Sequence, residues 1–313
     1  MSKPLISICI PTYNRARFLK ECLESITKQF SNQEIKKNVN VFILDNQSQD
    51  NTEEIAKKFT DTFKNVKYIK DSKKRNMIHG IIEVASLADG EYVWVFSDDD
   101  IHTKETLKVV IEFIKNNILD LIFCNISGFI ENKILYPNLL KIDNDKIINN
   151  RKELFIFLNQ KFYSTIHFYT TLCSNWIVKR EIFVKNHYIL EKFNNKLDMF
   201  PLPSLFFYTD IKFKSGIISK QILLIRGENT SWTKKNIFTN FIYSSRIWRD
   251  YYKKIVKYNK SFLPKYFILK VKIMNILAIK DFFKMILIKI FKKMQIYDKL
   301  RLIIKGKREV NEI

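Results

Sequence analysis

The chain has 313 residues, of which 46% are hydrophobic and 14% aromatic, and its 54 Lys and Arg residues outnumber its 32 Asp and Glu residues. This apolar content excludes intrinsic disorder as the main state, and six glycines and four scattered cysteines exclude collagen-like and disulfide-rich proteins. The formal net charge of +22 leaves three classes of partner open: nucleic acid, an anionic membrane surface, or small anionic substrates.

The first 125 residues alternate between short apolar runs and stretches with helical spacing. The apolar runs predict buried strands at residues 5–10, 39–44, 66–69, 92–96 and 119–124. The stretches with helical spacing predict helices at residues 19–30, after the capping residues 50–54, at 77–87 and at 103–115. Strands that alternate with amphipathic helices are typical of a mostly parallel α/β sheet.

Three polar segments directly follow strands of this predicted sheet. They occupy residues 11–15, 45–48 and 97–100. Ligands of open α/β sheets bind outside the carboxyl ends of the strands, so we expect these segments to meet at one edge and form the binding site.

The remainder of the chain is less regular. We expect a helix at residues 151–160, strands at 170–178 and 217–225, and a break at the Pro-Leu-Pro segment near residues 200–203. The four cysteines form no Cys-x-x-Cys pair, which disfavours a structural zinc site.

An aspartate triplet, Asp98-Asp99-Asp100, follows the predicted strand at residues 92–96. Three adjacent carboxylates repel one another unless a cation or solvent relieves them. Mg²⁺ and Mn²⁺ bind to few carboxylates together with substrate phosphates, so the triplet predicts a divalent metal site. The alternative is a solvated acidic loop that caps the next helix.

Four segments occur in an order typical of one enzyme family: ICIPTYNR at residues 8–15, ILDNQSQDNT at 43–52, Arg75-Asn76, and ADGEYVWVFSDDD at 88–100. In these segments the chain resembles glycosyltransferase family 2. SNWIVKR at 174–180 and RGEN at 226–229 look like the acceptor-side segments of bacterial members that decorate surface glycans.

The resemblance implies a GT-A fold, which is a Rossmann-like, mostly parallel sheet with flanking helices. Residues 1–125 would then form the nucleotide-sugar-binding half of one domain and residues 126–240 its acceptor-binding half. Residues 241–313 would add a basic amphipathic helical region, outside that domain.

The resemblance also implies which residues bind the nucleotide of the donor. They are Pro11, Thr12, Asn14, Arg15, Asp45, Asn46, Arg75, Asn76 and Asp98. The family usually has two acids where this chain has Asp45 and Asn46. This difference leaves the identity of the donor's nucleobase open, with uridine as the default. Ser72-Lys-Lys74 replaces the usual glycine-containing turn, and its lysines either help to hold the diphosphate or form a solvated loop.

Two registers are open for the aspartate triplet. One places Asp98 near the ribose and Asp99 on the metal, and the other makes Asp98 and Asp100 the metal-binding pair of a DxD motif. In both, Mn²⁺ or Mg²⁺ lies between carboxylates and diphosphate and offsets charge on the leaving nucleotide. Asp99 is the preferred metal ligand, with Asp100 beside it.

An inverting transferase needs a base that deprotonates the acceptor hydroxyl. Asp198 is the candidate base, and Asp210 and Glu228 are alternatives. The structural interpretation of Asp198 is an acid in a loop or turn without a catalytic role. His102 either touches phosphate or metal or, preferably, marks the entry of the following helix.

Excess charge concentrates at the end of the chain, where residues 246–313 hold 19 Lys and Arg against five Asp and Glu. Single lysines separate apolar pairs between residues 266 and 293, a pattern typical of helices that lie on anionic membranes. A helix packed on the domain is the alternative, and no nucleic-acid motif accompanies the basic residues. Because no signal peptide precedes the first strand, we expect a cytoplasmic, peripheral location on the inner membrane face.

The sequence therefore predicts an inverting, metal-dependent glycosyltransferase. It would move a sugar from a nucleotide-diphosphate donor, by default a UDP-sugar, to a glycan or lipid-linked oligosaccharide of a bacterial surface polysaccharide. The alternative is a non-catalytic membrane-associated protein with a residual nucleotide-sugar pocket. Nucleotidyl transfer is disfavoured because no Gly-rich phosphate loop follows the first strand.

Overall fold

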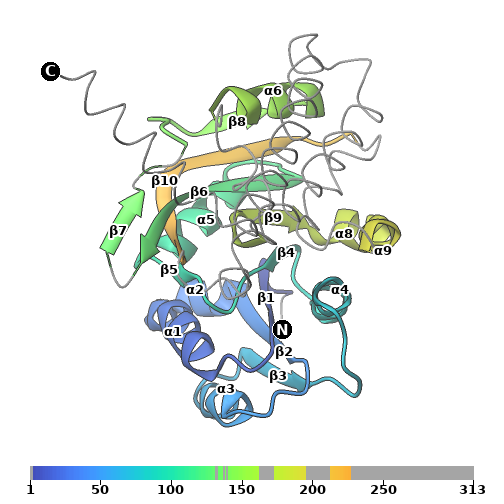
Figure 1. The fold of residues 1–313 in the computed structure, drawn as a ribbon. Helices are drawn as coiled ribbons and strands as arrows, with labels where there is room; N and C mark the ends of the chain where they lie inside the picture. The colour runs from blue at the N-terminus through green and yellow to red at the C-terminus, as the bar shows by residue number, and fades with distance from the viewer. Residues whose placement is uncertain are drawn as a thin grey trace, which may run out of the picture. The chain divides into compact units, whose positions relative to one another are not determined.

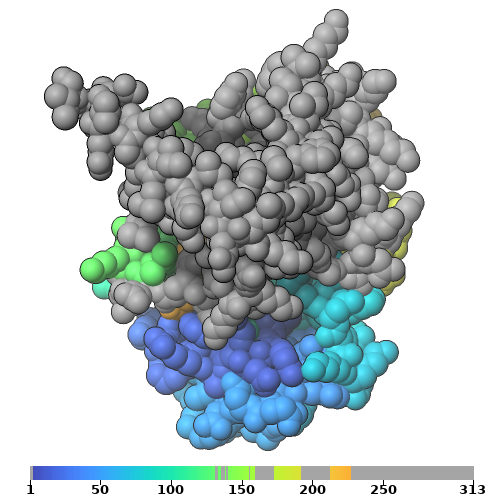
Figure 2. All heavy atoms as spheres, in the orientation of Figure 1, coloured from blue at the N-terminus to red at the C-terminus, as the bar shows by residue number. Residues whose placement is uncertain are grey.

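A computed structural model describes residues 3–130, 133–136, 138, 140–161, 173–194 and 212–226. The chain divides into two compact units, Met1–Thr233 and Lys234–Ile313, and every described residue belongs to the first. In the view of Figure 2 the blue and cyan atoms of the N-terminal half form one continuous body. No helix among the described residues is long and apolar enough to cross a membrane.

The strands of the described residues all belong to one ten-stranded sheet. In chain order they are β1 Ile6–Thr12, β2 Val39–Asp45, β3 Val66–Lys70, β4 Tyr92–Val95, β5 Ile101–His102, β6 Leu121–Ile130, β7 Lys133–Tyr136, β8 Lys146–Ile148, β9 Trp176–Lys179 and β10 Ser215–Arg226. The α-helices are α1 Ala16–Thr27, α2 Gln33–Asn38, α3 Thr52–Thr62, α4 Met77–Leu87, α5 Thr106–Lys115, α6 Arg151–Lys161, α8 Arg180–Asn186 and α9 Tyr188–Asn194. Two short 3₁₀ segments are η1 Lys28–Ser31 and η2 Cys173–Asn175.

The strand order is β3-β2-β1-β4-β9-β6-β10-β5, with β7 beside β6 and β8 beside β10. The first four strands are parallel, as the sequence predicts. Beyond β4 the sheet is mixed, because β9 runs antiparallel to both β4 and β6, whereas β10 runs parallel to β6. The result is the α/β fold class that was expected, with a parallel N-terminal half and a mixed second half.

Helices cover both faces of the parallel half. In Figure 1, α1 and α3 lie on one side of β1 and β2, and α4 lies on the other. Burial agrees with this arrangement, because every residue of β2 and all but one of β1 are buried. Parallel strands covered on both faces read as continuous apolar runs, which explains why these strands were visible in the sequence.

Several elements differ from the expectation. The helix expected from residue 103 begins at Thr106, and the two residues of β5 precede it. The strand expected at 119–124 continues to Ile130, and the region expected as a strand at 170–178 contains η2 and then β9. Residues 170–172, the Pro-Leu-Pro segment and the basic region after residue 240 lie outside the described residues.

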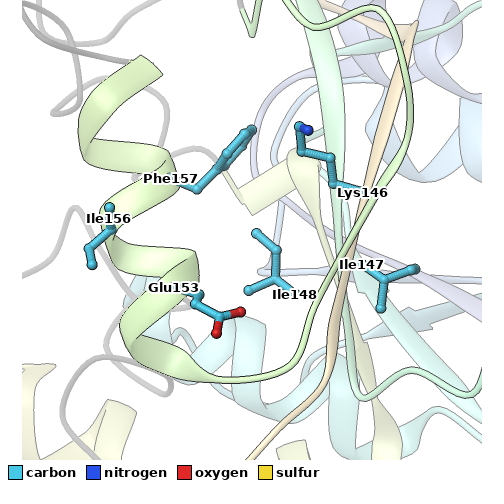
Figure 3. Close-up of a pocket in the computed structure, with 6 residues that line it drawn as sticks. All are labelled: Lys146, Ile147, Ile148, Glu153, Ile156 and Phe157. Carbon is cyan, nitrogen blue, oxygen red and sulfur yellow. The ribbon is translucent and has the colours of Figure 1, made fainter.

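A cavity of about 370 Å³ lies between β8 and α6. Figure 3 shows Phe157 and Glu153 projecting from the helix toward the strand, where Ile148 lies. Strand β8 pairs with the first residues of β10, Ser215 to Ile217, whereas the last residue of β10 contacts the aspartate triplet. The cavity is therefore separated from the triplet by the length of β10.

Candidate functional site

The three polar segments meet at the carboxyl edge of the parallel strands, as predicted. The backbone N–H of Asn46 donates to the carbonyl of Thr12 at 2.9 Å, and the backbone N–H of Asn14 donates to Ser48 Oγ at 2.8 Å. Thr12 Oγ1 then donates to Asp98 Oδ2 at 2.7 Å, across 86 positions of sequence. These bonds join the ends of β1, β2 and β4 into one site.

Two non-glycine residues in these turns adopt left-handed backbone conformations. Asn14 has a φ of 53° and Gln47 has a φ of 63°. Such conformations are uncommon outside glycine and concentrate at functional sites. Here they reverse the chain directly after β1 and β2, which keeps both turns at the sheet edge.

The first two aspartates of the triplet share one arginine. Asp98 Oδ1 accepts from Arg15 Nε at 2.9 Å, and Arg15 Nη2 pairs with Asp99 Oδ2. Ser97 Oγ donates to the other oxygen of Asp99 at 2.5 Å. Burial raises the pKa of Asp98 to about 6, although the Arg15 guanidinium acts in the opposite direction.

The third aspartate of the triplet faces the interior. Asp100 is 4% exposed, and its Oδ2 accepts from Ser174 Oγ at 2.5 Å. Its Oδ1 accepts from the backbone N–H of Arg226 at 3.1 Å. Burial, with the nearby charge of Asp99, raises the pKa of this carboxyl well above its ordinary value. Asp100 thus ties the triplet to η2 and to the end of β10.

Arg226 is the site residue that sequence reasoning missed as a partner of the triplet. Its Nε donates to the carbonyl of Asp99 at 3.0 Å, and its Nη2 pairs with Glu21 of α1. The guanidinium carbon lies 4.6 Å from the ring centroid of Phe129 and 5.2 Å from that of Phe18. Its position in the RGEN segment was visible, but a contact with residue 99 has no local sequence signal.

His102 is a core residue. It lies in β5, is 4% exposed, and stacks on Trp94 with its ring 4.6 Å from Phe96 at a steep angle. Burial lowers its pKa to about 3, and neither ring nitrogen has a hydrogen-bond partner among the described residues. We expected His102 to mark the entry of the following helix. In the structure it is instead a neutral imidazole in an aromatic core.

Asp45 and Asn46, the acid and the amide after β2, have different partners. Asp45 is fully buried; its Oδ1 accepts from the backbone N–H of Ser48 and its Oδ2 from the Tyr68 hydroxyl, both at 2.8 Å. Asn46 Oδ1 accepts from the N–H of Arg75 at 2.6 Å, and its Nδ2 donates to the carbonyl of Arg75 at 2.8 Å. Only an amide can satisfy both backbone groups, because a carboxylate has no hydrogen to donate.

The residues after β3 are held by further contacts. Arg75 pairs with Asp71 at 2.5 Å and with Glu83 at 3.2 Å. Asn76 is the N-cap of α4, where its Oδ1 accepts from the N–H of His79 at 3.0 Å. Sequence reasoning assigned both residues to the nucleotide, and the structure places Arg75 beside Asn46 at the site edge.

An aromatic side chain is exposed beside this loop. Tyr13 follows β1 and is 37% exposed, and Lys74 Nζ lies 3.1 Å from its hydroxyl and 4.7 Å from its ring centroid. Pro11 precedes Thr12 within β1. An exposed aromatic ring beside a cation offers a stacking surface for a nucleobase and a charge for a phosphate, so Tyr13 and Lys74 are candidate site residues.

The aspartate pair fits a divalent cation. Among the described residues no group of three or more His, Cys, Asp or Glu side chains could enclose a metal ion. Mg²⁺ needs only one or two carboxylates when substrate phosphates complete its shell. Asp98 and Asp99, which pair with Arg15, supply the one or two carboxylates that such a shell would use.

Other predicted site residues lie outside the described part of the chain. These are Asp198 and the alternative bases Asp210 and Glu228. Their roles stay predictions.

Comparison with solved structures defines the class of fold. Chains of S. aureus TarS, crystallised as residues 1–349 with UDP and with UDP-GlcNAc, superpose with TM-scores of 0.58 and 0.57 at 19% and 18% identity. The match to the UDP complex covers 82% of this chain and 66% of that chain, just under two thirds of its length. The protein therefore has the GT-A fold of glycosyltransferases.

Sequence comparison defines the family. Residues 7–185 match the family described as Glycosyl transferase family 2, and because this span exceeds half of the chain, the protein belongs to that family. It is 26% identical to the abequosyltransferase RfbV of Salmonella typhimurium over 82% of this chain and 78% of that protein. It is 27% identical to the uncharacterized glycosyltransferase MJ1057 of Methanocaldococcus jannaschii over 90% of this chain and 95% of that protein.

Proposed function

We propose that this glycosyltransferase moves a sugar from a nucleotide-diphosphate donor, by default a UDP-sugar, to a hydroxyl of a glycan or lipid-linked oligosaccharide. The reaction would depend on a divalent metal, invert the anomeric centre and serve bacterial surface polysaccharide synthesis. The observation that carries the proposal is the Arg15-bridged pair Asp98 and Asp99 at the carboxyl edge of β1 and β4. The similarity to an abequosyltransferase and to TarS, which was crystallised with UDP and UDP-GlcNAc, supports the donor class.

The chain's own residues divide the work at this edge. Asp99 would hold Mn²⁺ or Mg²⁺, which would offset charge on the departing diphosphate, and Asp98 would lie near the ribose. Arg15 adds a guanidinium that suits phosphate oxygens, and Thr12 fixes the Asp98 carboxylate by its 2.7 Å hydrogen bond. Asp100 faces Ser174 and β10, which supports the register with Asp99 as the metal ligand.

The bond changes define what the base must do. The acceptor oxygen bonds to the anomeric carbon while the bond from that carbon to the diphosphate oxygen breaks, and the nucleoside diphosphate departs. The acceptor proton passes to a carboxylate, for which we retain Asp198. Attack on the face opposite the leaving group gives inversion.

The nucleobase of the donor would be bound by Tyr13 and the loop beside Asn46. Lys74 at the Tyr13 ring and Arg75 at the Asn46 amide bring this loop to the end of β1. Pro11, Asn14, Asp45 and Asn76 would shape the same pocket through the turns that they form or cap. Uridine is the default base.

The basic region would hold the enzyme at a membrane. Residues 246–313 carry a net charge of +14, and lysines near an anionic surface contribute about 1 kcal/mol each. We therefore propose a peripheral location on the cytoplasmic face. In the full chain, replacing Lys284, Lys289, Lys292 and Lys293 by Gln should weaken sedimentation with anionic liposomes, and unchanged sedimentation would contradict this location.

Turnover by the full-length protein tests the proposed reaction. Nucleotide sugars with different bases are incubated with Mn²⁺ and a membrane acceptor fraction, and release of nucleoside diphosphate is measured. We expect one donor to be consumed and Asp99→Asn to lower its turnover at least 100-fold, while the exposed Asp61→Asn on α3 leaves it unchanged. Nucleotide binding without turnover would favour the non-catalytic alternative, and near-normal turnover by Asp99→Asn would contradict the metal assignment.

A further inference from the structure

One buried cation joins the aspartate triplet to β10 and α1. Arg226 ends β10, and its side chain is only 3% exposed. Its backbone N–H donates to Asp100, its Nε donates to the carbonyl of Asp99, and its Nη2 pairs with Glu21. These partners lie 126, 127 and 205 positions away in sequence.

The surroundings of Arg226 explain why a charge is tolerated there. A buried guanidinium is costly unless it is paired and hydrogen-bonded. Glu21 supplies the opposite charge, and the rings of Phe18 and Phe129 lie at cation–π distance. The planar fork of arginine lets one side chain reach the Asp99 carbonyl and the Glu21 carboxylate together, which a lysine ammonium cannot do.

These contacts fix Asp99 from two directions. Its carboxylate is held by Ser97 and Arg15 on one side, and its carbonyl by Arg226 on the other. The orientation of the Asp99 carboxylate depends on the backbone that carries it. Mutation of residues that hydrogen-bond to a metal ligand without touching the metal typically alters metal affinity 10- to 100-fold.

We infer that Arg226 is a positioning residue for Asp99. It holds the backbone of the triplet against α1 and β10, so that the Asp99 carboxylate is oriented to bind the cation and the donor diphosphate together. The inference rests on the proposed function, and it makes Glu21, on the partly exposed surface of α1, a second member of the same unit.

The test is the strengthening of nucleotide binding by Mn²⁺ in the full-length protein. The nucleoside diphosphate that binds tightest among UDP, CDP, GDP and dTDP is titrated with and without Mn²⁺ by calorimetry. For Arg226→Lys we expect the affinity in Mn²⁺ to fall about 10-fold while the affinity without metal stays within about twofold. A purely structural role would weaken both titrations together.

A second variant keeps the test decisive if Arg226→Lys does not fold. Glu21→Gln leaves Arg226 in place but removes its charged partner, and we expect the Mn²⁺-dependent affinity to fall about threefold. Glu24→Gln is the matched control, since Glu24 pairs with Lys20 on the same helix and contacts no residue of the triplet in the described part of the chain. Glu24→Gln should match the wild type.

The outcomes separate this inference from the proposed function. If the wild type binds none of the four nucleotides, the proposed function fails. If it binds one with Mn²⁺ enhancement, and folded Arg226→Lys and Glu21→Gln keep that enhancement, the positioning role is wrong and the proposed function stands. Loss of the enhancement in either variant but not in Glu24→Gln supports the role.

Discussion

The two halves of the sheet differ in the range of the contacts that build them. In the first half, β3, β2, β1 and β4 are parallel neighbours connected by one or two α-helices, and their turns carry the groups that would touch the donor. In the second half, β9, β6 and β10 are brought together across long stretches of chain. That half contributes Ser174 and Arg226, which donate hydrogen bonds to the buried carboxylate of Asp100. The first half thus presents the candidate site, and the second half holds it in place.

The largest effect that would sharpen this comparison is expected at His102, where the halves meet. His102 stacks on Trp94 of β4, while its own strand β5 pairs with β10. Its pKa is lowered to about 3 in the folded protein, so below the ordinary value near 6.5 the unfolded chain binds the extra proton. The contribution of His102 to the unfolding free energy is therefore complete above pH 6.5. It is lost as the pH falls toward 3, by about 1.4 kcal/mol per pH unit.

Urea unfolding at pH 7 and pH 5 measures this effect. Between these values the wild type should lose about 2 kcal/mol more unfolding free energy than His102→Phe, which keeps an aromatic ring but does not titrate. Equal losses in the two proteins would show that His102 is not held neutral in the core.

An effect of comparable size is expected from the contact between the halves at Ser174. Its hydroxyl donates to Asp100 and accepts from the backbone N–H of Ser97, so Ser174→Ala leaves both groups short of a partner. We expect a loss of about 1–3 kcal/mol in unfolding free energy, measured by urea denaturation. Ser86→Ala is the control, because this exposed serine bonds only to Ile82 of its own helix among the described residues. Similar losses in both variants would argue against the role of Ser174.

The smallest effect concerns a contact inside the first half. Asn46→Asp removes the donor to the Arg75 carbonyl and places a carboxylate oxygen there instead. Unfolding free energy should fall by about 1 kcal/mol and nucleotide affinity by about fivefold. The same amide-to-acid change at Asn32, the N-cap of α2, should be neutral because Asp caps as well as Asn. No difference between the two variants would remove Asn46 from the site.

The same difference in contact range explains what the sequence could predict. Apolar runs and helical spacing located β1 to β4, α4 and the convergence of the three polar turns, because these depend on local pattern and on the rule for parallel strands. Neither pattern reports that β9 is inserted between β4 and β6, since strands pair across intervals that leave no periodic signal. Arg226 and Ser174 were missed as partners of the triplet for the same reason.

His102 shows the opposite limit. Its neighbours in the sequence, an aspartate triplet before it and a helical pattern after it, favoured a residue at the entry of the following helix. Its place between Trp94 and Phe96 is set by tertiary packing. Local pattern therefore located the candidate site but did not distinguish its side chains from those that face the core.

The most direct test of the central claim is the binding of Mn²⁺ itself. Electron paramagnetic resonance measures free Mn²⁺ as it is titrated into the full-length protein with its nucleoside diphosphate, for wild type, Asp99→Asn and the control Asp61→Asn. The account predicts tight nucleotide-dependent binding in wild type and Asp61→Asn and a loss of at least 10-fold in Asp99→Asn. Equal Mn²⁺ binding by all three proteins would contradict the assignment of the metal and diphosphate to this edge of the sheet.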